Sequence, residues 1–434
     1  MTNKMKLPSI LALILILFLS LSAVSASEDI QLVTNATDSV IDDSLSISDL
    51  NNGLSSNFDD SNNEIISDNL DDEIADSKEP NKLRDSSSDV ISGSEPIVID
   101  SSSYSSYFDS NGAIKSGALK DGDTIKIKSI RDKVFTINKR LNIVSDDGET
   151  LSNCLIRLVE GSSGSVLNNL KIVNTKEKIT GSNYYLSGIS IIDSANNTIE
   201  NSIINVSVHK CFAIMMSNAS FNKIINNTII SGLSSTIPMT ASSYNEIRDN
   251  HIESEYTNMI YQCAYGNGDF MPIEDEVCSG NIIANNYLKS RNGTYNSYCY
   301  AIYLMQTASG EGAVIANNTI ENAFYGIIVE APNTLIYNNT ISNIGGPAAI
   351  LASGNNIIIS SNDISTEHTD VRDWNDDGNV VAIQNTGKNN IITNNTLRSV
   401  GSDSILNTGE NVQIVNNTIT QNLQIASILQ DPML

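Results

Sequence analysis

The residues best suited to bind a metal ion lie in one short acidic stretch near the C-terminal end of the sequence. Asp373, Asn375 and Asp377 occupy positions 1, 3 and 5 of a calcium-loop pattern, and Gly378 occupies position 6, where such loops turn sharply. Position 12 holds Gln384 instead of a glutamate that binds calcium through both oxygens. The pattern therefore indicates calcium as an optional ligand, with no cofactor required, and an acidic turn without metal is the alternative.

Aromatic side chains are concentrated in segments that interrupt the regular repeats described below. Eight of the fifteen tyrosines lie between Tyr256 and Tyr303. Tyrosine presents a flat apolar face with a polar tip, which suits a sugar ring or a protein partner. Burial of the same rings against the body of the protein is the alternative. We expect a ligand-binding surface made of Tyr256, Tyr261, Tyr265, Tyr295, Tyr298, Tyr300, Tyr303 and Trp374.

The acidic residues and histidines form no recognisable catalytic constellation. Glycoside hydrolysis needs two carboxylates that face each other across the scissile bond. The pairs Asp146–Asp147 and Asp376–Asp377 lie far apart in the sequence, and the three histidines share no motif: His209, His251 and His368. We therefore assign no catalytic residue and expect binding rather than catalysis.

A recurring phrase, Ile-x-x-Asn-x-Ile/Leu, determines the predicted architecture. It occurs in full as IINNTI, IRDNHI, IANNYL, IANNTI, IYNNTI, ISSNDI, ITNNTL and IVNNTI. The last apolar residue recurs every 21 to 26 residues, or every 32 to 36 where a coil carries an excursion. Repeats of this length indicate a solenoid. These apolar positions are Leu170, Ile203, Ile229, Ile252, Leu288, Ile320, Ile341, Ile364, Leu397 and Ile419.

An asparagine stands two residues before each of these apolar positions. Residues two apart in a strand share a face, so the asparagine is expected to point inward with the apolar residue. There its amide can bond to the equivalent amides one coil above and below, about 4.8 Å away. Asparagine also tolerates the left-handed backbone of a sharp bend. The predicted Asn ladder comprises Asn168, Asn201, Asn227, Asn250, Asn286, Asn318, Asn339, Asn362, Asn395 and Asn417.

The N-terminal segment indicates export. Lys4 and Lys6 precede an apolar run and small residues, so residues 1–26 are predicted to be a signal peptide and the protein to be secreted, extracellular or at the cell surface. After its removal we expect no integral membrane segment, because no later run approaches the 18 to 20 apolar residues of a membrane-spanning helix.

The acidity of the chain is concentrated in residues 27–95. This segment has 18 acidic residues against three basic ones, out of a formal net charge of −25 for the whole chain. Its apolar surface is too small to offset chain entropy, which predicts a disordered acidic spacer rich in Ser, Asp and Asn. Such a charge balance excludes a nucleic-acid partner, since no basic patch can neutralise phosphates.

Alternation of apolar and polar residues begins after the spacer. Runs such as DTIKIKSI in residues 96–160 predict an N-terminal cap and opening coils, and residues 161–434 form the repeats. The expected fold is all-β, a right-handed parallel β-helix of about ten or more coils. A leucine-rich horseshoe is disfavoured because Ile and Asn, instead of Leu, dominate each repeat.

The signal, the acidic spacer, the run GDTIKIKSI…FTINKRLNI and the NNTI coils together resemble the adhesin-like proteins of methanogenic archaea, members of the pectin-lyase-like superfamily. The resemblance covers nearly the whole chain. It implies adhesion to, or recognition of, extracellular carbohydrate or a surface protein of a neighbouring cell. A polysaccharide lyase or hydrolase and a passive structural rod of the cell envelope are the alternatives.

Overall fold

The structure is a computed structural model. It describes residues 95–175, 186–207, 211–232, 234–263, 278–291, 299–305, 312–366, 380–400 and 403–422. The chain divides into two units after Ser86, and the predicted signal peptide and all but the last residue of the predicted spacer lie outside the described residues. In the part of the chain that the structure describes, no helix is both long and apolar enough to span a membrane.

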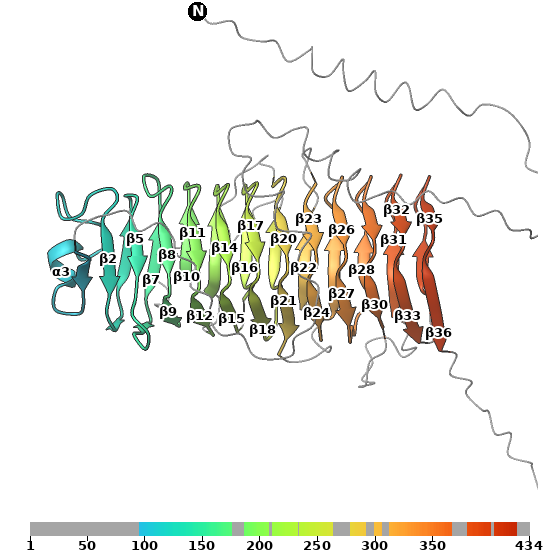
Figure 1. Cartoon of the computed structure of the whole chain (residues 1–434), viewed down its shortest axis with the longest axis horizontal. Helices are drawn as coiled ribbons and strands as arrows, with labels where there is room; N and C mark the ends of the chain where they lie inside the picture. Colours follow the sequence, from blue (N-terminus) through green and yellow to red (C-terminus); the bar gives the residue numbers. More distant parts are fainter. Residues whose placement is uncertain are drawn as a thin grey trace, which may run out of the picture. The chain divides into compact units, whose positions relative to one another are not determined.

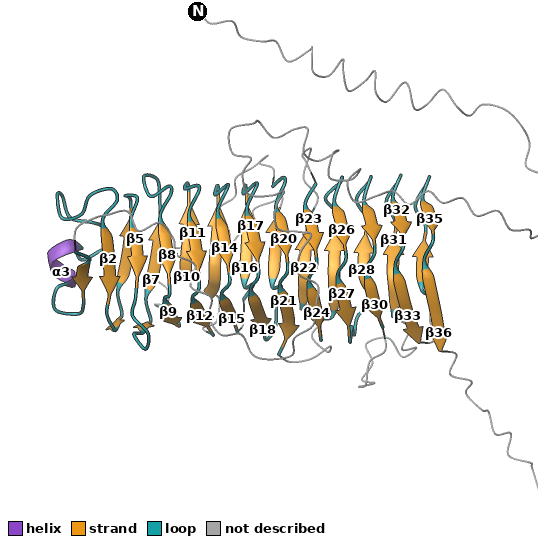
Figure 2. Ribbon diagram, viewed as in Figure 1, coloured by secondary structure: helices purple, strands orange, loops and turns teal. Residues whose placement is uncertain are grey.

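The described unit is a stack of coils, each made of three short strands that belong to three different parallel sheets (Figures 1 and 2). Strands form because each segment alternates inward Ile or Leu with outward polar residues, as in the buried and partly buried alternation of Thr124–Ile127. Each strand inside the stack pairs in parallel with the equivalent strand of the coil before and after it. This arrangement confirms the predicted parallel β-helix.

The thirteen-stranded sheet contains the strand that opens each coil. Its order is β1 (Ile97–Ile99), β2 (Thr124–Ile127), β5 (Asn142–Val144), β8 (Val166–Asn168), β11 (Thr198–Glu200), β14 (Lys223–Ile225), β17 (Glu246–Arg248), β20 (Ile282–Ala284), β23 (Val314–Ala316), β26 (Leu335–Tyr337), β29 (Ile358–Ser360), β32 (Ile391–Thr393) and β35 (Gln413–Val415).

The twelve-stranded sheet contains the second strand of each coil. Its order is β3 (Ile130–Arg131), β6 (Leu151–Ser152), β9 (Lys171–Val173), β12 (Ile203–Val206), β15 (Thr228–Ser231), β18 (His251–Ser254), β21 (Tyr287–Ser290), β24 (Thr319–Glu321), β27 (Thr340–Ser342), β30 (Asp363–Ser365), β33 (Thr396–Val400) and β36 (Thr418–Asn422).

The eleven-stranded sheet contains the strand that closes each coil. In chain order its strands are β4 (Val134–Ile137), β7 (Leu155–Leu158), β10 (Leu186–Ile192), β13 (Cys211–Ser217), β16 (Ile237–Thr240), β19 (Ile260–Cys263), β22 (Tyr300–Leu304), β25 (Tyr325–Val329), β28 (Ala348–Ala352), β31 (Val381–Asn385) and β34 (Ile405–Asn407).

The core is a set of columns of equivalent apolar residues, mostly isoleucine and leucine, that run along the stack. Ile247, Ile283 and Ile315 are register partners in consecutive coils and are fully buried, and so are Ile252 and Leu288. Burial of one such side chain stabilises a protein by about 1.5 to 3 kcal/mol relative to an exposed one. Eight of the ten predicted apolar positions are buried in this way, whereas Ile203 and Ile419 are 45% and 51% exposed.

The N-terminal end of this core is covered by a short cap. Helix α3 (Tyr104–Tyr107) lies against the first coils at the blue end of the chain in Figure 1. The rings of Tyr104, Phe108 and Phe135 contact one another, with centroids 5.1 to 5.4 Å apart, and Phe108 and Phe135 are almost completely buried. The aromatic cluster thus shields the first layer of isoleucines from water.

The Asn ladder is confirmed for eight of the ten predicted asparagines. Asn318 illustrates the pattern: its amide nitrogen donates to the oxygens of Asn339 and Ile283, each at 2.9 Å, and its oxygen accepts from the side chain of Asn286 at 3.0 Å. The same link joins each consecutive pair in the series Asn227, Asn250, Asn286, Asn318, Asn339, Asn362, Asn395 and Asn417.

The two asparagines of each Asn-Asn pair have different roles. Asn317 and Asn338, the first of their pairs, adopt the left-handed conformation with φ of 56° and 52° and make the bend. Their side chains lie outside, where the Asn338 amide donates to Asn317 at 2.8 Å. The second asparagine of the pair points inward and forms the ladder, so the ladder residues are not the left-handed ones.

Asn168 and Asn201 were wrongly assigned to the ladder. Asn168 is the last residue of β8, and Asn201 is left-handed and exposed. The ladder position in these coils is taken by Leu170 and Ser202, whose hydroxyl accepts from the Leu170 backbone at 3.0 Å.

The predicted apolar position Ile203 was also wrong, and like Asn201 it lies one residue before the true position. Ile203 is 45% exposed, whereas Ile204 is fully buried and pairs with Ile229. Because both residues are isoleucine, the repeat could be aligned one residue out of phase, and a shift of one residue in a strand reverses its faces.

Candidate ligand-binding surfaces

The structure describes four of the eight predicted aromatic ligand-binding residues. Tyr256 follows β18 and is 44% exposed, and Tyr261, Tyr300 and Tyr303 lie on strands of the eleven-stranded sheet. The remaining four lie outside the described residues: Tyr265, Tyr295, Tyr298 and Trp374. The predicted calcium ligands also lie outside them: Asp373, Asn375 and Asp377.

Four tyrosines come together on the outer face of strands β19, β22 and β25. Tyr261 is the register partner of Tyr303, and Tyr300 is the register partner of Tyr325. Ring centroids are 5.4 Å apart for Tyr261 and Tyr303, 5.7 Å for Tyr300 and Tyr303, and 5.4 Å for Tyr300 and Tyr325. We call Tyr261, Tyr300, Tyr303 and Tyr325 the tyrosine cluster. All four are partly exposed.

Two hydroxyl groups of the tyrosine cluster, those of Tyr261 and Tyr303, donate to neighbouring side chains. The Tyr303 hydroxyl donates to Glu330 at 2.8 Å, and the Tyr261 hydroxyl donates to the sulfur of Met305 at 3.1 Å. Burial, and then the proximity of Tyr300, raise the pKa of Tyr325. The cluster therefore offers flat apolar rings and hydroxyl groups, which suits stacking and hydrogen bonding.

Sequence reasoning found three members of this cluster and missed Tyr325. Tyr325 lies 22 residues beyond Tyr303, outside the segment between residues 256 and 303 in which tyrosines are concentrated. Only the register of β25 against β22 places it beside Tyr300. The available signal was the coil period, because residues one coil apart in the same strand position lie side by side.

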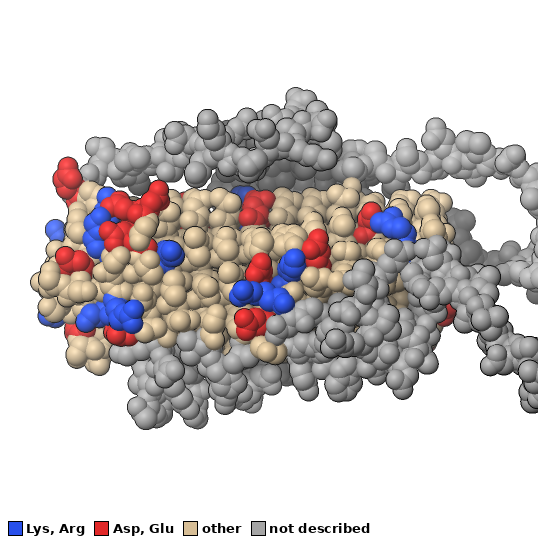
Figure 3. Space-filling model, turned by 90° about the horizontal axis from the view of Figure 1, so that it is seen from below, with Lys and Arg blue, Asp and Glu red and all other residues tan. Residues whose placement is uncertain are grey.

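A second group of side chains lies on the outer face of the twelve-stranded sheet. His251 and Arg291 both contact Glu253, at 2.8 and 3.3 Å, and the Tyr287 hydroxyl donates to Glu321 at 2.8 Å. Burial and the bond to Glu321 raise the pKa of Tyr287 to about 12. Figure 3 shows charged residues of both signs in a group half-way along the β-helix and in another at its N-terminal end.

This mixed-charge surface suits ion pairing better than acid–base catalysis. Glu253 already contacts two groups that carry or can carry a positive charge, and Lys289 lies 4.0 Å from Glu321. His251 lies outward in a polar position, as its slot in the repeat indicates, and its ring centroid is 4.9 Å from that of Tyr287.

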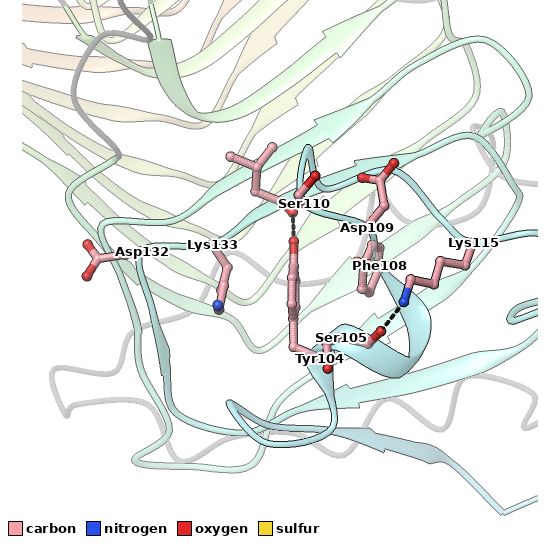
Figure 4. Close-up of a pocket in the computed structure, with 9 residues that line it drawn as sticks. Tyr104, Ser105, Phe108, Asp109, Ser110, Lys115, Asp132 and Lys133 are labelled. Carbon is pink, nitrogen blue, oxygen red and sulfur yellow. Dashed lines mark hydrogen bonds between the residues drawn. The ribbon is translucent and has the colours of Figure 1, made fainter.

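A pocket of about 480 Å³ lies in the N-terminal cap, between α3 and the segment around Lys133 (Figure 4). Tyr104 stands in it, with the Lys133 ammonium 4.8 Å from the ring centroid and its hydroxyl bonded to the Val134 carbonyl. Burial, and then Asp109, raise the pKa of Tyr104 to about 12, so this hydroxyl is a donor at neutral pH.

The charged residues around the cap pocket are used by the fold. Asp109 accepts from the backbone of Asn111 and Ala113 at 2.8 and 2.9 Å, and Lys115 donates to the Ser105 carbonyl. Asp132 is in the left-handed conformation and accepts from a neighbouring asparagine amide at 3.2 Å. These bonds fix the turns of the cap, and we assign the pocket no ligand.

The acidic pair Asp146–Asp147 is likewise engaged in local contacts. Asp146 contacts Lys126 at 2.9 Å and Lys128 at 2.5 Å, and hydrogen bonds from Lys128 and then Lys126 lower its pKa. Asp147 accepts from Asn169 at 2.9 Å. The other pair, Asp376–Asp377, lies outside the described residues. Among the residues with described positions, no three His, Cys, Asp or Glu side chains are placed to hold a metal ion.

Comparison with known proteins identifies the fold. Residues 300–431 match the family model "Right handed beta helix region". A search of the curated proteins found no match.

Solved structures similar to the chain include a GH87 α-1,3-glucanase catalytic domain in complex with tetrasaccharides, at 16% identity over 72% of this chain and 68% of that one, with a TM-score of 0.43. DFA-IIIase from Arthrobacter chlorophenolicus A6 matches at 14% identity over 69% and 83%, with a TM-score of 0.45. A Geobacillus virus E2 protein, ORF18, matches at 11% identity over 75% and 61%, with a TM-score of 0.38. Likenesses this remote bear on neither ligand nor activity. Together with the three parallel sheets, the family match identifies a right-handed parallel β-helix protein.

Proposed function

We propose that this protein is a secreted, cell-surface β-helix that recognises extracellular carbohydrate or the surface of a neighbouring cell. The observation that supports this proposal is the tyrosine cluster, in which three consecutive strands bring four rings together on an outer face. Tyrosine rings offer a flat apolar surface for the C–H face of a sugar and hydroxyl groups for its polar rim.

The scaffold under the cluster supports recognition because it is rigid. Ile260, Ile302 and Ile327 are register partners beneath the cluster and are fully buried. A surface held by packed strands loses little conformational freedom when a ligand binds, which favours affinity. Recognition also fits the carboxylates described above, since Asp146 and Glu253 contact cations and are poorly suited to act as a catalytic acid and base.

Binding to a glycan array tests the proposal, with and without calcium, because calcium is an optional ligand of the predicted acidic loop. We expect saturable binding by the full-length protein that falls at least tenfold in a Tyr300→Ala, Tyr303→Ala variant. Tyr337→Ala is the matched control, since Tyr337 is a partly exposed tyrosine on another sheet. Circular dichroism establishes that each variant is folded.

Two results would contradict this function. Absence of binding to any glycan or cell surface would favour a passive structural rod. Release of reducing sugars from polysaccharides during the same incubation would favour a lyase or hydrolase instead.

A further inference from the structure

One row of residues lies at the bend between the eleven-stranded and the thirteen-stranded sheets. Six of its eight members donate their backbone N–H to a carbonyl of the next coil, as Asn196 does to Ser220 and Asn333 does to Asn355. The members are left-handed, with φ between 55° and 59°, and most are asparagine or glycine: Asn196, Phe221, Tyr244, Gly280, Asn333, Asn356, Asn389 and Asn411.

Phe221 and Tyr244 are the exceptions in this row. Their φ values are 59° and 55°, in a region that bulky side chains enter only at an energetic cost. Burial does not compensate for that cost, because Phe221 is 53% exposed and Tyr244 is 36% exposed. Asparagine in the same positions would relieve the strain, as it does in five other coils. Strain retained at an exposed site points to a role in binding.

The two rings stack on each other and are exposed together at the bend. Their centroids are 5.2 Å apart and their planes differ by 9°, so the rings are stacked one coil apart. We call Phe221 and Tyr244 the aromatic pair. It lies at a bend and on the coils of β13 and β16, whereas the tyrosine cluster lies on the flat face of β19, β22 and β25.

A second row of buried asparagines fixes the backbone under the aromatic pair. Asn222 directly follows Phe221, and Asn245 directly follows Tyr244; both are buried. The Asn222 amide donates to Asn245 at 3.1 Å, and the Asn245 amide donates to Asn281 at 3.2 Å. Hydrogen bonds of the neighbouring buried asparagines therefore fix the backbone next to Phe221 and Tyr244, which preorganises the two rings for binding.

The charged side chains on and just after β14 and β17, the strands that follow the aromatic pair, balance one another. Lys223 lies 3.8 Å from Glu246, and Arg248 contacts both Glu246 and Asp249. All four are partly exposed and supply both hydrogen-bond donors and acceptors. Two positive and two negative groups give no net attraction for a polyanion, so this surface suits a ligand with hydroxyl groups and no charge.

From these observations we infer that the aromatic pair is a second carbohydrate-binding site, separate from the tyrosine cluster, and that its ligand is a neutral glycan. A hexopyranose ring packs its apolar C–H face against the exposed part of the aromatic pair, and its hydroxyl groups bond to Glu246 and Arg248. The inference does not depend on the tyrosine cluster, because the two surfaces share no residue.

The test uses the full-length protein and soluble neutral glucans, mannans and galactans of defined length, with polygalacturonate as the acidic probe. Isothermal titration calorimetry measures affinity for each. The first variant is Phe221→Asn, Tyr244→Asn, which introduces the residue that other coils carry in this row. We expect at least tenfold weaker binding of the neutral glycan together with a thermal unfolding temperature that is unchanged or raised.

A second variant and a control keep the test decisive. Phe221→Leu, Tyr244→Leu keeps apolar bulk without a ring face and should weaken binding to the same extent, so it decides the question if the asparagine variant fails to fold. Tyr337→Asn replaces a partly exposed tyrosine elsewhere on the thirteen-stranded sheet and should leave binding unchanged.

Binding that stays within twofold of wild type in both double variants would overturn the inference, as would a wild-type protein that binds none of the neutral probes or prefers polygalacturonate. The Tyr300→Ala, Tyr303→Ala variant separates failure of this inference from failure of the proposed function. If that variant loses binding while the aromatic-pair variants keep it, the tyrosine cluster is the site and the inference about the aromatic pair fails.

Discussion

Replacement of one ladder asparagine by alanine tests the claim that the ladder, and not the apolar columns alone, holds the coils in register. Asn318 is 1% exposed, and its side chain makes four hydrogen bonds: two to Asn286, one to Asn339 and one to the Ile283 carbonyl. A buried hydrogen bond contributes about 1 kcal/mol, and a buried donor left without a partner costs about 1 to 3 kcal/mol. We therefore expect Asn318→Ala to lower the free energy of unfolding by about 4 kcal/mol.

The adjacent residue offers a matched control. Asn317 is in the same coil, but it is left-handed with φ of 56° and its side chain lies outside. Asn317→Gly suits that backbone, so its effect on the free energy of unfolding should stay within about 1 kcal/mol. Urea denaturation followed by circular dichroism gives both values. Equal losses in the two variants, or a loss below about 1 kcal/mol for Asn318→Ala, would refute the reasoning.

Two further predictions concern the register of β12 and the buried thiol of Cys154. Ile204→Asp buries a charge without a partner and should prevent folding or lower the unfolding temperature sharply. Ile203→Asp should change the free energy of unfolding by about 0.5 kcal/mol or less, because Ile203 is 45% exposed. Thermal unfolding distinguishes the two variants, and equal unfolding temperatures would contradict the assigned faces of β12. Burial raises the pKa of Cys154 from 9.0 to about 11, so the protonated thiol stabilises the fold below pH 9 and this contribution is lost as the pH rises through 11. The difference in free energy of unfolding between wild type and Cys154→Ala should therefore narrow from pH 9 to pH 11 in urea titrations. A difference that stays constant over this range would contradict the prediction.

Much of the fold could be predicted from the sequence because the same residue types recur at the same positions of each coil, with asparagine in the ladder and isoleucine or leucine in the core. Asn227 to Asn417 lie in the ladder as expected, and Ile229 and Ile252 are buried. The error at Ile203 arose because Ile203 and Ile204 are both apolar, so hydrophobicity alone could not decide which one faces inward. Pairing of β12 with β15 decides it.

A second inner row of asparagines was missed, although the sequence contained a signal for it. Asn222, Asn245 and Asn281 each stand five residues before a ladder asparagine and two before a buried isoleucine. This is the same Asn-x-Ile spacing that revealed the ladder, at the other bend of the coil.

The candidate sites were harder to predict than the fold. The position of Tyr325 beside Tyr300 depends on how long each excursion is, and excursion length varies from coil to coil. The left-handed backbone of Phe221 and Tyr244 could not be read from residue type, because aromatic residues rarely adopt it. The left-handed conformation of these two residues becomes apparent only when their positions are aligned with the asparagines and the glycine that occupy the same bend in other coils.

The ladder also bears on how a chain of this kind can change its length in evolution. Each amide oxygen accepts from the asparagine of the coil before it, and each amide nitrogen donates to the asparagine of the coil after it, as in Asn286, Asn318 and Asn339. Duplication or loss of one whole coil, such as the 21 residues that separate Asn318 from Asn339, would leave every remaining amide with an equivalent neighbour. Genes for such proteins can therefore grow or shrink by recombination between their own repeats, and the reach of the binding surfaces can vary while the packing of each coil stays the same.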